Sequence, residues 1–245
     1  MSSLRGSFPN SLTRLRKSLP GGRLPLLLLG ALLAAVPAFA EMPAYLRAAL
    51  GKFSAEIPPG WAYTLKTERD GRQTVERYDP TRPSTEQWTL LLSNGRPPTE
   101  EELAKYFKYK AGQSPGAMQS NFQKSDIEPG SITLVSEDAG RAEFTCAFRE
   151  QSTHADKMLG HLGLHLTVCK QPAYVEKFTL ELREPYSPVL WVKMRELVVE
   201  MGYAPPADGR PSLPSRSSSH FVGRIFLIRM EENLRFTYSD FAPPP

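Results

Sequence analysis

The sequence predicts an α+β protein, mainly β, in which a strongly curved antiparallel sheet forms an open half-barrel covered by one or two amphipathic helices. Three observations predict it. Apolar residues recur at every second position through much of the second half of the chain, as in strands with one buried face. Turn signals such as the hairpin signal Asp70-Gly71 join successive strands over short distances, which favours antiparallel pairing, and Asn94-Gly95 ends another strand. Two other segments have helical spacing and are available to cover the apolar face.

Two segments match amphipathic helices. Residues 42–53 carry apolar side chains at roughly helical spacing. The second helix, from Thr99 to about Lys110, is better defined because Thr99 and Glu102 have the spacing of a capping box. Acidic residues lie in its first turn and basic residues in its last, which suits the helix dipole. Its expected apolar face consists of Leu103, Tyr106 and Phe107.

The other periodic segments alternate between apolar and polar residues and are expected to be strands. A loop rich in Pro, Gly and Ser, residues 204–219, is expected to separate the last strands from the rest, and residues 231–233 are expected to form the final turn. The expected strands are residues 61–66, 74–78, 88–92, 132–135, 142–149, 162–168, 178–182, 197–203, 221–230 and 234–238.

The first 40 residues have the three parts of a secretory signal. Basic residues without any acid come first, a run of roughly 13 apolar residues begins at Leu24, and Ala38-Phe39-Ala40 presents small residues to a signal peptidase. The run is shorter than the ~20 residues that cross a bilayer as a helix. We therefore expect cleavage after Ala40, a periplasmic location and no stable transmembrane anchor. One β-rich domain over residues 41–241 and a disordered tail, residues 242–245, would follow the signal.

Removing the signal changes the charge balance. The whole chain has 30 basic and 26 acidic residues, a formal net charge of +4, and five of the basic residues precede the expected cleavage site. The remaining 25 basic and 26 acidic residues leave the mature chain close to neutral. A near-neutral chain lacks the strong positive field on which nucleic-acid binding depends, so no nucleic-acid partner is expected.

The two cysteines, Cys146 and Cys169, fall on strands of opposite phase. Cys146 alternates with the apolar side chains of its strand, whereas Cys169 alternates with the polar positions of the next. The thiols are therefore expected on opposite sides of the sheet, which argues against a disulfide that the compartment would permit. No C-x-x-C motif indicates a redox role.

The motifs that resemble catalytic or metal-binding sites are better explained by structural roles. Residues 112–116 match the G-x-S-x-G nucleophile pattern, but Pro115 has no N–H to give to an oxyanion hole. His161 and His165 lie four residues apart. In a strand this spacing separates the two residues by roughly 13 Å, which is too far for both side chains to bind one ion. His154 precedes them by seven residues. We therefore expect no enzyme, no metal site and no cofactor.

Three stretches carry a family resemblance. They are residues 76–80 (ERYDP), residues 88–99 (WTLLLSNGRPPT) and residues 238–241 (YSDF). Their order resembles that in a family of exported proteobacterial proteins over most of residues 55–241. More loosely, the arrangement is similar to the periplasmic lipoprotein-carrier (LolA/LolB-like) fold, an unclosed antiparallel barrel whose helices lid an apolar cavity. That likeness implies a cavity for acyl chains and transfers no individual residue to this chain.

The leading hypothesis is therefore a non-enzymatic cell-envelope protein that binds or carries an apolar or amphipathic ligand, such as a lipid or a lipoprotein acyl chain. The alternative is a scaffold or subunit that binds another envelope protein along an exposed sheet edge. A concave apolar face with few polar groups is typical of ligand cavities. Its expected lining residues are Phe144, Phe148, Leu180, Val199, Met201, Phe226 and Phe236.

Overall fold

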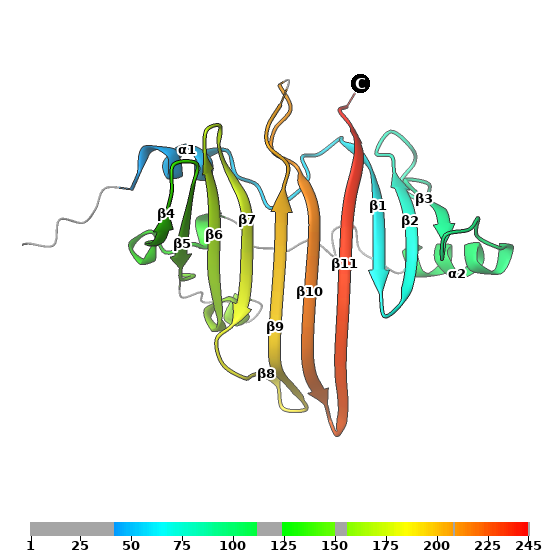
Figure 1. The fold of residues 1–245 in the computed structure, drawn as a ribbon. Helices are drawn as coiled ribbons and strands as arrows, with labels where there is room; N and C mark the ends of the chain where they lie inside the picture. Colours follow the sequence, from blue (N-terminus) through cyan, green and yellow to red (C-terminus); the bar gives the residue numbers. More distant parts are fainter. Residues whose placement is uncertain (1–41, 112–123, 150–155, 208, 245) are drawn as a thin grey trace, which may run out of the picture. The chain divides into compact units, whose positions relative to one another are not determined.

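Residues 42–245 are built around a single antiparallel sheet and form one compact unit (Figure 1). The computed structural model describes residues 42–111, 124–149, 156–207 and 209–244. The strands are β1 (Ala62–Arg69), β2 (Arg72–Tyr78), β3 (Trp88–Ser93), β4 (Thr133–Glu137), β5 (Arg141–Cys146), β6 (Leu162–Lys170), β7 (Ala173–Leu182), β8 (Tyr186–Val189), β9 (Val192–Tyr203), β10 (Pro214–Ile225) and β11 (Ile228–Ala242). The helices are α1 (Ala44–Lys52) and α2 (Glu100–Ala111), with short 3-10 turns η1 (Lys124–Asp126), η2 (Pro129–Ser131) and η3 (Asp156–His161).

The strand order across the sheet is β3-β2-β1-β11-β10-β9-β7-β6-β5-β4, and β8 pairs with β9 beside this path. All of these pairs are antiparallel. The sheet is not closed, because β3 and β4 stand at its two ends (Figure 1). The prediction of an α+β protein, mainly β, with an antiparallel sheet and two helices is thus confirmed.

The two predicted turns form as expected. Asp70 and Gly71 have φ values of 48° and 78°, and Asn94 and Gly95 have values of 49° and 79°. At Asp70-Gly71, two consecutive residues with positive φ match the twist of β1 and β2, which they join, whereas Asn94-Gly95 ends β3 ahead of α2. The Asn94 side chain also accepts a hydrogen bond of 3.0 Å from the backbone N–H of Gln73, which ties the end of β3 to β2.

Helix α2 begins with the predicted capping box. The backbone N–H of Glu102 donates to Thr99 Oγ1 at 3.3 Å, and the backbone N–H of Thr99 donates to Glu102 Oε2 at 2.8 Å. The apolar face is narrower than predicted, because Tyr106 is buried whereas the side chain of Phe107 is 49% exposed. Only one aromatic residue of this turn therefore packs toward the sheet, while Phe107 lies against the ring of Tyr106.

One row of cross-strand partners crosses the whole sheet. Directly opposed residues project from the same face, so this row identifies a common face from one edge strand to the other. The row consists of Leu134, Phe144, Leu166, Phe178, Met201, Ser217, Phe236, Thr67, Thr74 and Ser93. It is apolar at the β4 end and carries hydroxyl groups at the β3 end, so the two halves of one face have different chemistry.

The two helices belong to different halves of this face. Helix α1 packs on β6 and β7, where Leu46 and Ala49 are buried in the larger core together with Phe178. A smaller core forms around Tyr63 and Leu65 in the half near α2. Strand β10 lies between these halves and places buried Ser217 in the row described above. The apolar face is therefore divided into two separate cores.

The prediction of a loop over residues 204–219 followed by a strand over residues 221–230 has the wrong bounds, because β10 spans Pro214–Ile225. Strand β10 begins at Pro214, so the serine-rich segment is paired on both sides, with β9 and with β11. The predicted turn at residues 231–233 instead lies inside β11, and the turn is at Phe226-Leu227. Serine and acidic residues disfavour strands only weakly when both neighbouring strands are present, because pairing and packing then decide the conformation. Strand β11 extends to Ala242, which pairs with Ala62.

Both thiols are free. Cys146 is opposite Leu164 and Cys169 is opposite Arg141, at different levels of the β5–β6 pair, and burial raises the pKa of Cys146 to about 12. Within the described ranges, no helix is long and apolar enough to cross a membrane. The expected signal with its cleavage site at Ala40, the motif at residues 112–116 and His154 lie outside the residues that the structure describes.

Candidate ligand-binding groove

Most of the predicted lining residues are part of the packed core under α1. Phe144, Phe148, Leu180 and Met201 are all buried, and Val199 is half-buried against the same cluster. Their neighbours include Leu46 of α1, which has no exposed surface, and Phe53, whose ring lies edge-on to Phe178 at 6.2 Å. These side chains are close to one another as predicted, but they fill the space between helix and sheet.

The other two predicted residues lie elsewhere. Phe236 is buried in the smaller core with Tyr63 and Leu65. Phe226 occupies the turn between β10 and β11, where 67% of its surface is exposed. The seven residues therefore divide among two cores and a surface turn, and they do not line one cavity.

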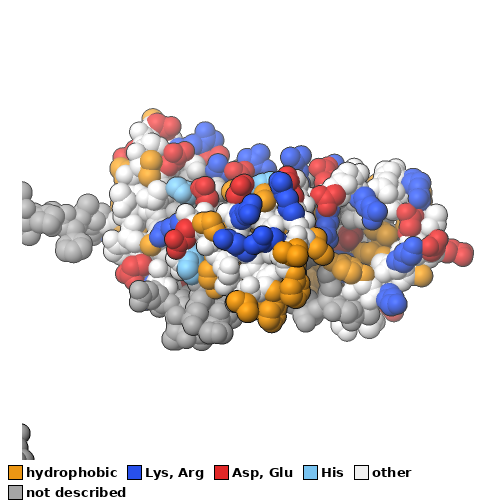
Figure 2. Space-filling model, turned by 90° about the horizontal axis from the view of Figure 1, so that it is seen from below, with side chains coloured by type: hydrophobic (Ala, Val, Ile, Leu, Met, Phe, Trp, Pro, Cys, Tyr) orange, Lys and Arg blue, Asp and Glu red, His pale blue; other side chains and the backbone are white. Residues whose placement is uncertain are grey.

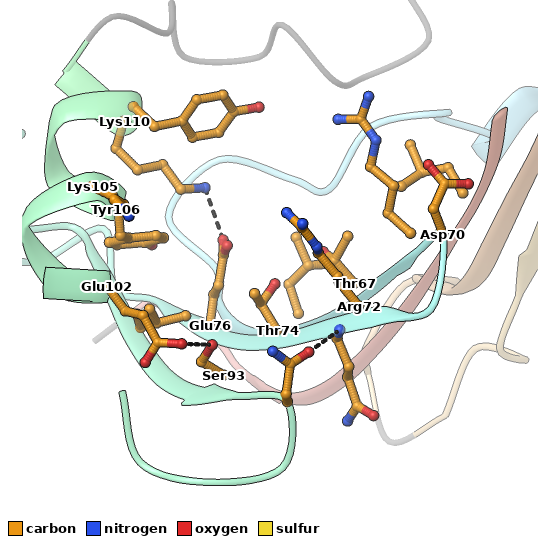
Figure 3. A pocket seen from close by; sticks show the side chains of 17 residues that line it. Thr67, Asp70, Arg72, Thr74, Glu76, Ser93, Glu102, Lys105, Tyr106 and Lys110 are labelled. Atoms are coloured by element: carbon orange, nitrogen blue, oxygen red, sulfur yellow. Dashed lines mark hydrogen bonds and ion pairs between the residues drawn. The ribbon is translucent and has the colours of Figure 1, made fainter. Parts of the chain in front are cut away.

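An open groove is present at the other half of the same face. It lies between α2 and the inward side of β1, β2 and β3, and has a volume of about 960 Å³ (Figure 3). Ligand pockets typically have volumes of roughly 300–1,000 Å³. The groove is therefore large enough for a small organic molecule of mixed polarity.

The floor of the groove is built from successive cross-strand rows. The first row places Leu65 opposite Glu76 and Glu76 opposite Leu90. The next places Thr67 opposite Thr74, which in turn is opposite Ser93. Apart from the Glu76 carboxylate in the first row, polarity thus rises along the strands toward the turn that joins β1 to β2.

The last row lies beside that turn and is cationic. Arg69 is opposite Arg72, and both line the groove. Arg69 forms an ion pair with Glu232 at 3.2 Å, whereas Arg72 has no ion-pair partner among the described residues. Like charges directly opposite each other on two strands destabilise the pair, so this row favours a neighbouring anion.

An ion pair inside the groove holds α2 against the sheet. Lys110 Nζ donates to Glu76 Oε2 at 2.8 Å, with side chains that are 17% and 10% exposed. The same ammonium group lies 3.9 Å from the ring centroid of Trp88, in a cation–π contact. Figure 3 shows Lys110 reaching from the helix to Glu76 on the strand. The buried carboxylate is therefore neutralised by a residue of the helix.

Tyr106 lies in the groove wall beside this pair. Its hydroxyl group is buried and has no hydrogen-bond partner within the described part of the chain. Burial, followed by the charge of Glu76, raises the pKa of Tyr106. The phenol is thus a neutral donor at physiological pH, and a buried donor of this kind gains free energy from any acceptor that reaches it.

The start of α2 is anchored by Glu102. Its carboxylate accepts hydrogen bonds from the backbone of Thr99, from Arg96 at 2.9 and 3.0 Å, and from Ser93 Oγ at 2.8 Å. These contacts, the Thr99 backbone first and then Arg96 and Ser93, lower the pKa of Glu102 to about 2. One end of the groove is therefore held rigid by a network of charged groups.

Sequence reasoning did not identify the groove residues. A usable signal was present, because the Asp70-Gly71 turn sets Arg69 opposite Arg72 and Leu65 opposite Glu76. Glu76 is also in phase with Thr74, on the side of β2 that faces inward. An acid at an inward position needs a cation nearby. Lys110, seven residues after Leu103 and four after Tyr106, occupies the same side of the predicted helix.

No protein-family model matches the chain, and no curated protein matches its sequence. Among solved structures, an isomerase-inactive variant of GphF DH1 is 9% identical over 82% of this chain and 80% of that one, with a TM-score of 0.15. A GphF dehydratase variant for improved crystallization is 10% identical over 80% of this chain and 81% of that one, with a TM-score of 0.14. With TM-scores this low, neither structure informs the fold or the site.

Proposed function

We propose that the protein is a non-enzymatic, exported cell-envelope protein that binds or carries an amphipathic ligand with an anionic group, and that the groove between α2 and β1–β3 is its binding site. The observation that carries this proposal is the order of the rows on the groove floor. Leu65 and Leu90 come first, on either side of Glu76, whose charge Lys110 neutralises. Thr67 and Thr74 follow, and the pair of Arg69 and Arg72 comes last.

That order matches the polarity of an amphipathic molecule. From Leu65 to Arg69 the strand advances by four residues, or roughly 13 Å, which suits a medium-length alkyl chain. The chain would lie over Leu65 and Leu90, with its anionic group beside Arg72. A charge-assisted hydrogen bond from a guanidinium group fixes the position of a carboxylate or phosphate, while burial of the alkyl chain supplies affinity.

The charged groups of the groove favour binding over catalysis. Glu76 is held by Lys110 and Glu102 by Arg96, so each carboxylate already has a cationic partner. General acid–base catalysis needs carboxylates whose pKa values are tuned toward the working pH. The depressed pKa of Glu102 is the opposite of what a general acid requires. The expected secretory signal and likeness to lipoprotein carriers accord with a carrier in the envelope.

Calorimetric titration with two ligands of equal chain length tests the proposal. Decanoate is expected to bind more tightly than decyl glucoside, because only decanoate has an anion to place beside Arg72. The variant Arg72→Gln is expected to weaken decanoate binding by about tenfold, the effect of losing one charge-assisted hydrogen bond, and to leave decyl glucoside unchanged.

Arg235→Gln is the matched control. Arg235 alternates with Leu234 and Phe236 on β11 and therefore projects from the other face of the sheet, where it lies near Glu68. Its replacement removes the same charge without touching the groove. Equal affinity of the two ligands, or equal loss of decanoate binding in both variants, would contradict the proposal.

A second candidate function rests on the edge strand β4. All five residues of Thr133–Glu137 are exposed, including Leu134 and Val135, and within the described ranges β4 pairs with β5 alone. An edge of this kind is a template for strand addition by another protein. Val135→Pro would abolish such pairing and leave decanoate binding intact, whereas Arg72→Gln would weaken decanoate binding and leave the pairing intact. Crosslinking of these two variants to envelope proteins therefore separates this function from ligand binding in the groove.

A further inference from the structure

Two neighbouring hairpin turns expose an unusual amount of apolar surface at one end of the sheet. We call this surface the apolar tip: Val189, Leu190 and Trp191 from the β8–β9 turn, with Phe226, Leu227 and Ile228 from the β10–β11 turn. Leu190 and Leu227 are 96% and 91% exposed, and Trp191, Phe226 and Ile228 are more than half exposed. Exposed apolar side chains gathered in this way mark an interaction site.

The apolar tip is an ordered surface made by both turns together. The backbone N–H of Phe226 donates to the carbonyl oxygen of Trp191 at 2.7 Å. The rings of these two residues are stacked, with centroids 6.1 Å apart and planes 10° from parallel. Each hairpin turns in two residues, between the pairs Val189–Val192 and Ile225–Ile228.

The residues in these two turns are unusual for hairpin turns. Two-residue hairpin turns favour Gly, Asn and Asp, because at least one residue has positive φ. Here the turn residues are Leu190-Trp191 and Phe226-Leu227, and Phe226 has a φ of 53°. A bulky aromatic residue in this conformation is strained, and such strain points to a functional constraint on the side chain.

A row of cations lies directly behind the apolar tip. Lys193 on β9 is opposite Arg224 on β10, and Arg224 is opposite Arg229 on β11. Among the residues that the structure describes, Arg229 has an acidic partner, Glu231 at 3.1 Å, while Lys193 and Arg224 have none. Three like charges in register on one face repel one another, so the row is stabilised by an external anionic surface.

The two chain segments that contain these turns have no acidic residue. Residues 186–195 and 223–230 carry Lys193, Arg195, Arg224 and Arg229 but neither Asp nor Glu. Figure 2, which views the molecule from the end where these turns lie, shows hydrophobic side chains beside a group of Lys and Arg side chains. The apolar and cationic parts of the surface are therefore adjacent.

We propose that the apolar tip inserts into the surface of an anionic phospholipid bilayer, with Lys193, Arg224 and Arg229 contacting the lipid headgroups. This inference goes beyond the proposed ligand groove, since it concerns the β8–β9 and β10–β11 turns and none of the groove residues. Aliphatic side chains enter the acyl boundary, Trp191 suits the interfacial layer, and the cations behind them match a negative surface. A protein partner is less well matched, because the cores of protein interfaces are depleted of charge.

Vesicle flotation tests this proposal. The purified chain, in the processed form that the producing cell yields and with its intact mass checked for every variant, is mixed with vesicles of phosphatidylglycerol and phosphatidylethanolamine in equal parts. Replacing both Leu190 and Leu227 with Ser is expected to lower the partition coefficient by at least about tenfold, since each leucine loses its apolar contact with lipid. Leu134→Ser, on the exposed edge strand β4 and away from the apolar tip, is the control for loss of an exposed leucine and is expected to have no effect.

The charged row is tested separately. Lys193→Gln with Arg224→Gln is expected to lower binding by about fivefold for each charge, and wild-type binding is expected to weaken with salt. Vesicles of phosphatidylcholine alone should float with little protein. Quenching of tryptophan fluorescence by brominated lipid should disappear in Trp191→Phe, although Trp61 and Trp88 remain.

Four results of the vesicle experiments would each overturn the proposal. They are absence of binding to the anionic vesicles, equal binding by wild type and the double serine variant, equal binding to phosphatidylcholine vesicles, or quenching that persists in Trp191→Phe. Self-association that requires Leu190 and Leu227, without vesicle binding, would assign the apolar tip to a second copy of the chain and would also overturn it.

Discussion

Lys110 Nζ donates a hydrogen bond of 2.8 Å to the carboxylate of Glu76, and this pair ties α2 to the middle strand of the β1–β3 group. Both side chains are mostly buried, and the charge of each is compensated mainly by the other. The contact spans 34 residues of sequence. This long-range ion pair therefore holds the last turn of α2 against the groove floor, while Glu102 holds the first turn.

Replacing one partner of this pair is expected to be costly. Lys110→Met leaves the Glu76 carboxylate buried without its cation, and the free energy of unfolding should fall by about 3 kcal/mol. Adding Glu76→Gln in the same chain should recover most of the loss, because the buried charge is then gone. Urea unfolding of the two variants measures both effects. A single and a double variant of equal stability would show that the pair does not act as a unit.

The capping network of α2 predicts a pH dependence. The pKa of Glu102 is lowered from 4.5 to about 2 by hydrogen bonds that exist only in the folded state. A carboxyl group with a depressed folded-state pKa stabilises the fold fully above its unfolded pKa, and this contribution is lost as the pH falls. Wild-type stability should therefore decrease between about pH 4.5 and pH 2, and Glu102→Gln should show a smaller decrease.

Measuring unfolding by circular dichroism across that pH range checks this expectation. Glu101→Gln is a suitable control because Glu101 lies on the same helix turn and, among the described residues, forms its ion pair with Lys105 on the surface. If the two variants lose the same amount of stability on acidification, the Glu102 network does not contribute as its geometry indicates.

Truncating a side chain of the core and truncating a side chain of the apolar tip should have different effects on the free energy of unfolding. Leu46→Ala removes a fully buried side chain beneath α1 and should lower the free energy of unfolding by about 3 kcal/mol. Phe226→Gly replaces an exposed side chain at a position with φ of 53°, where glycine is unstrained, and should leave stability unchanged or raise it by about 1 kcal/mol. Thermal unfolding distinguishes these results, and a large loss in Phe226→Gly would show that the tip is structural.

Local features of the fold could be predicted from the sequence. The Asp70-Gly71 turn and the Thr99–Glu102 capping box form because both depend on residues a few positions apart. Strand β10 could not be predicted in the same way. Ser217 adopts an extended conformation because Met201 and Phe236 lie on either side of it, and these neighbours are 16 and 19 positions away in the chain.

The groove could not be predicted from the alternation of apolar and polar residues alone. Period-two alternation correctly placed Phe144, Phe148 and Met201 on the apolar face, but it does not tell whether that face is filled. Filling depends on how α1 docks, and the groove depends on how α2 docks through Lys110 and Glu76. Such contacts join distant segments, and their register follows from the assembled sheet.

Photoaffinity labelling tests the binding groove most directly. A decanoate analogue with a diazirine at the end of its alkyl chain is irradiated with the protein, and the labelled residues are mapped by mass spectrometry. The groove account predicts labels at Leu65, Leu90 or Tyr106 that unlabelled decanoate competes away and that Arg72→Gln weakens. Competed labels at Phe148 and Val199 in the core under α1, or at the apolar tip, would contradict the assignment of the ligand to the groove.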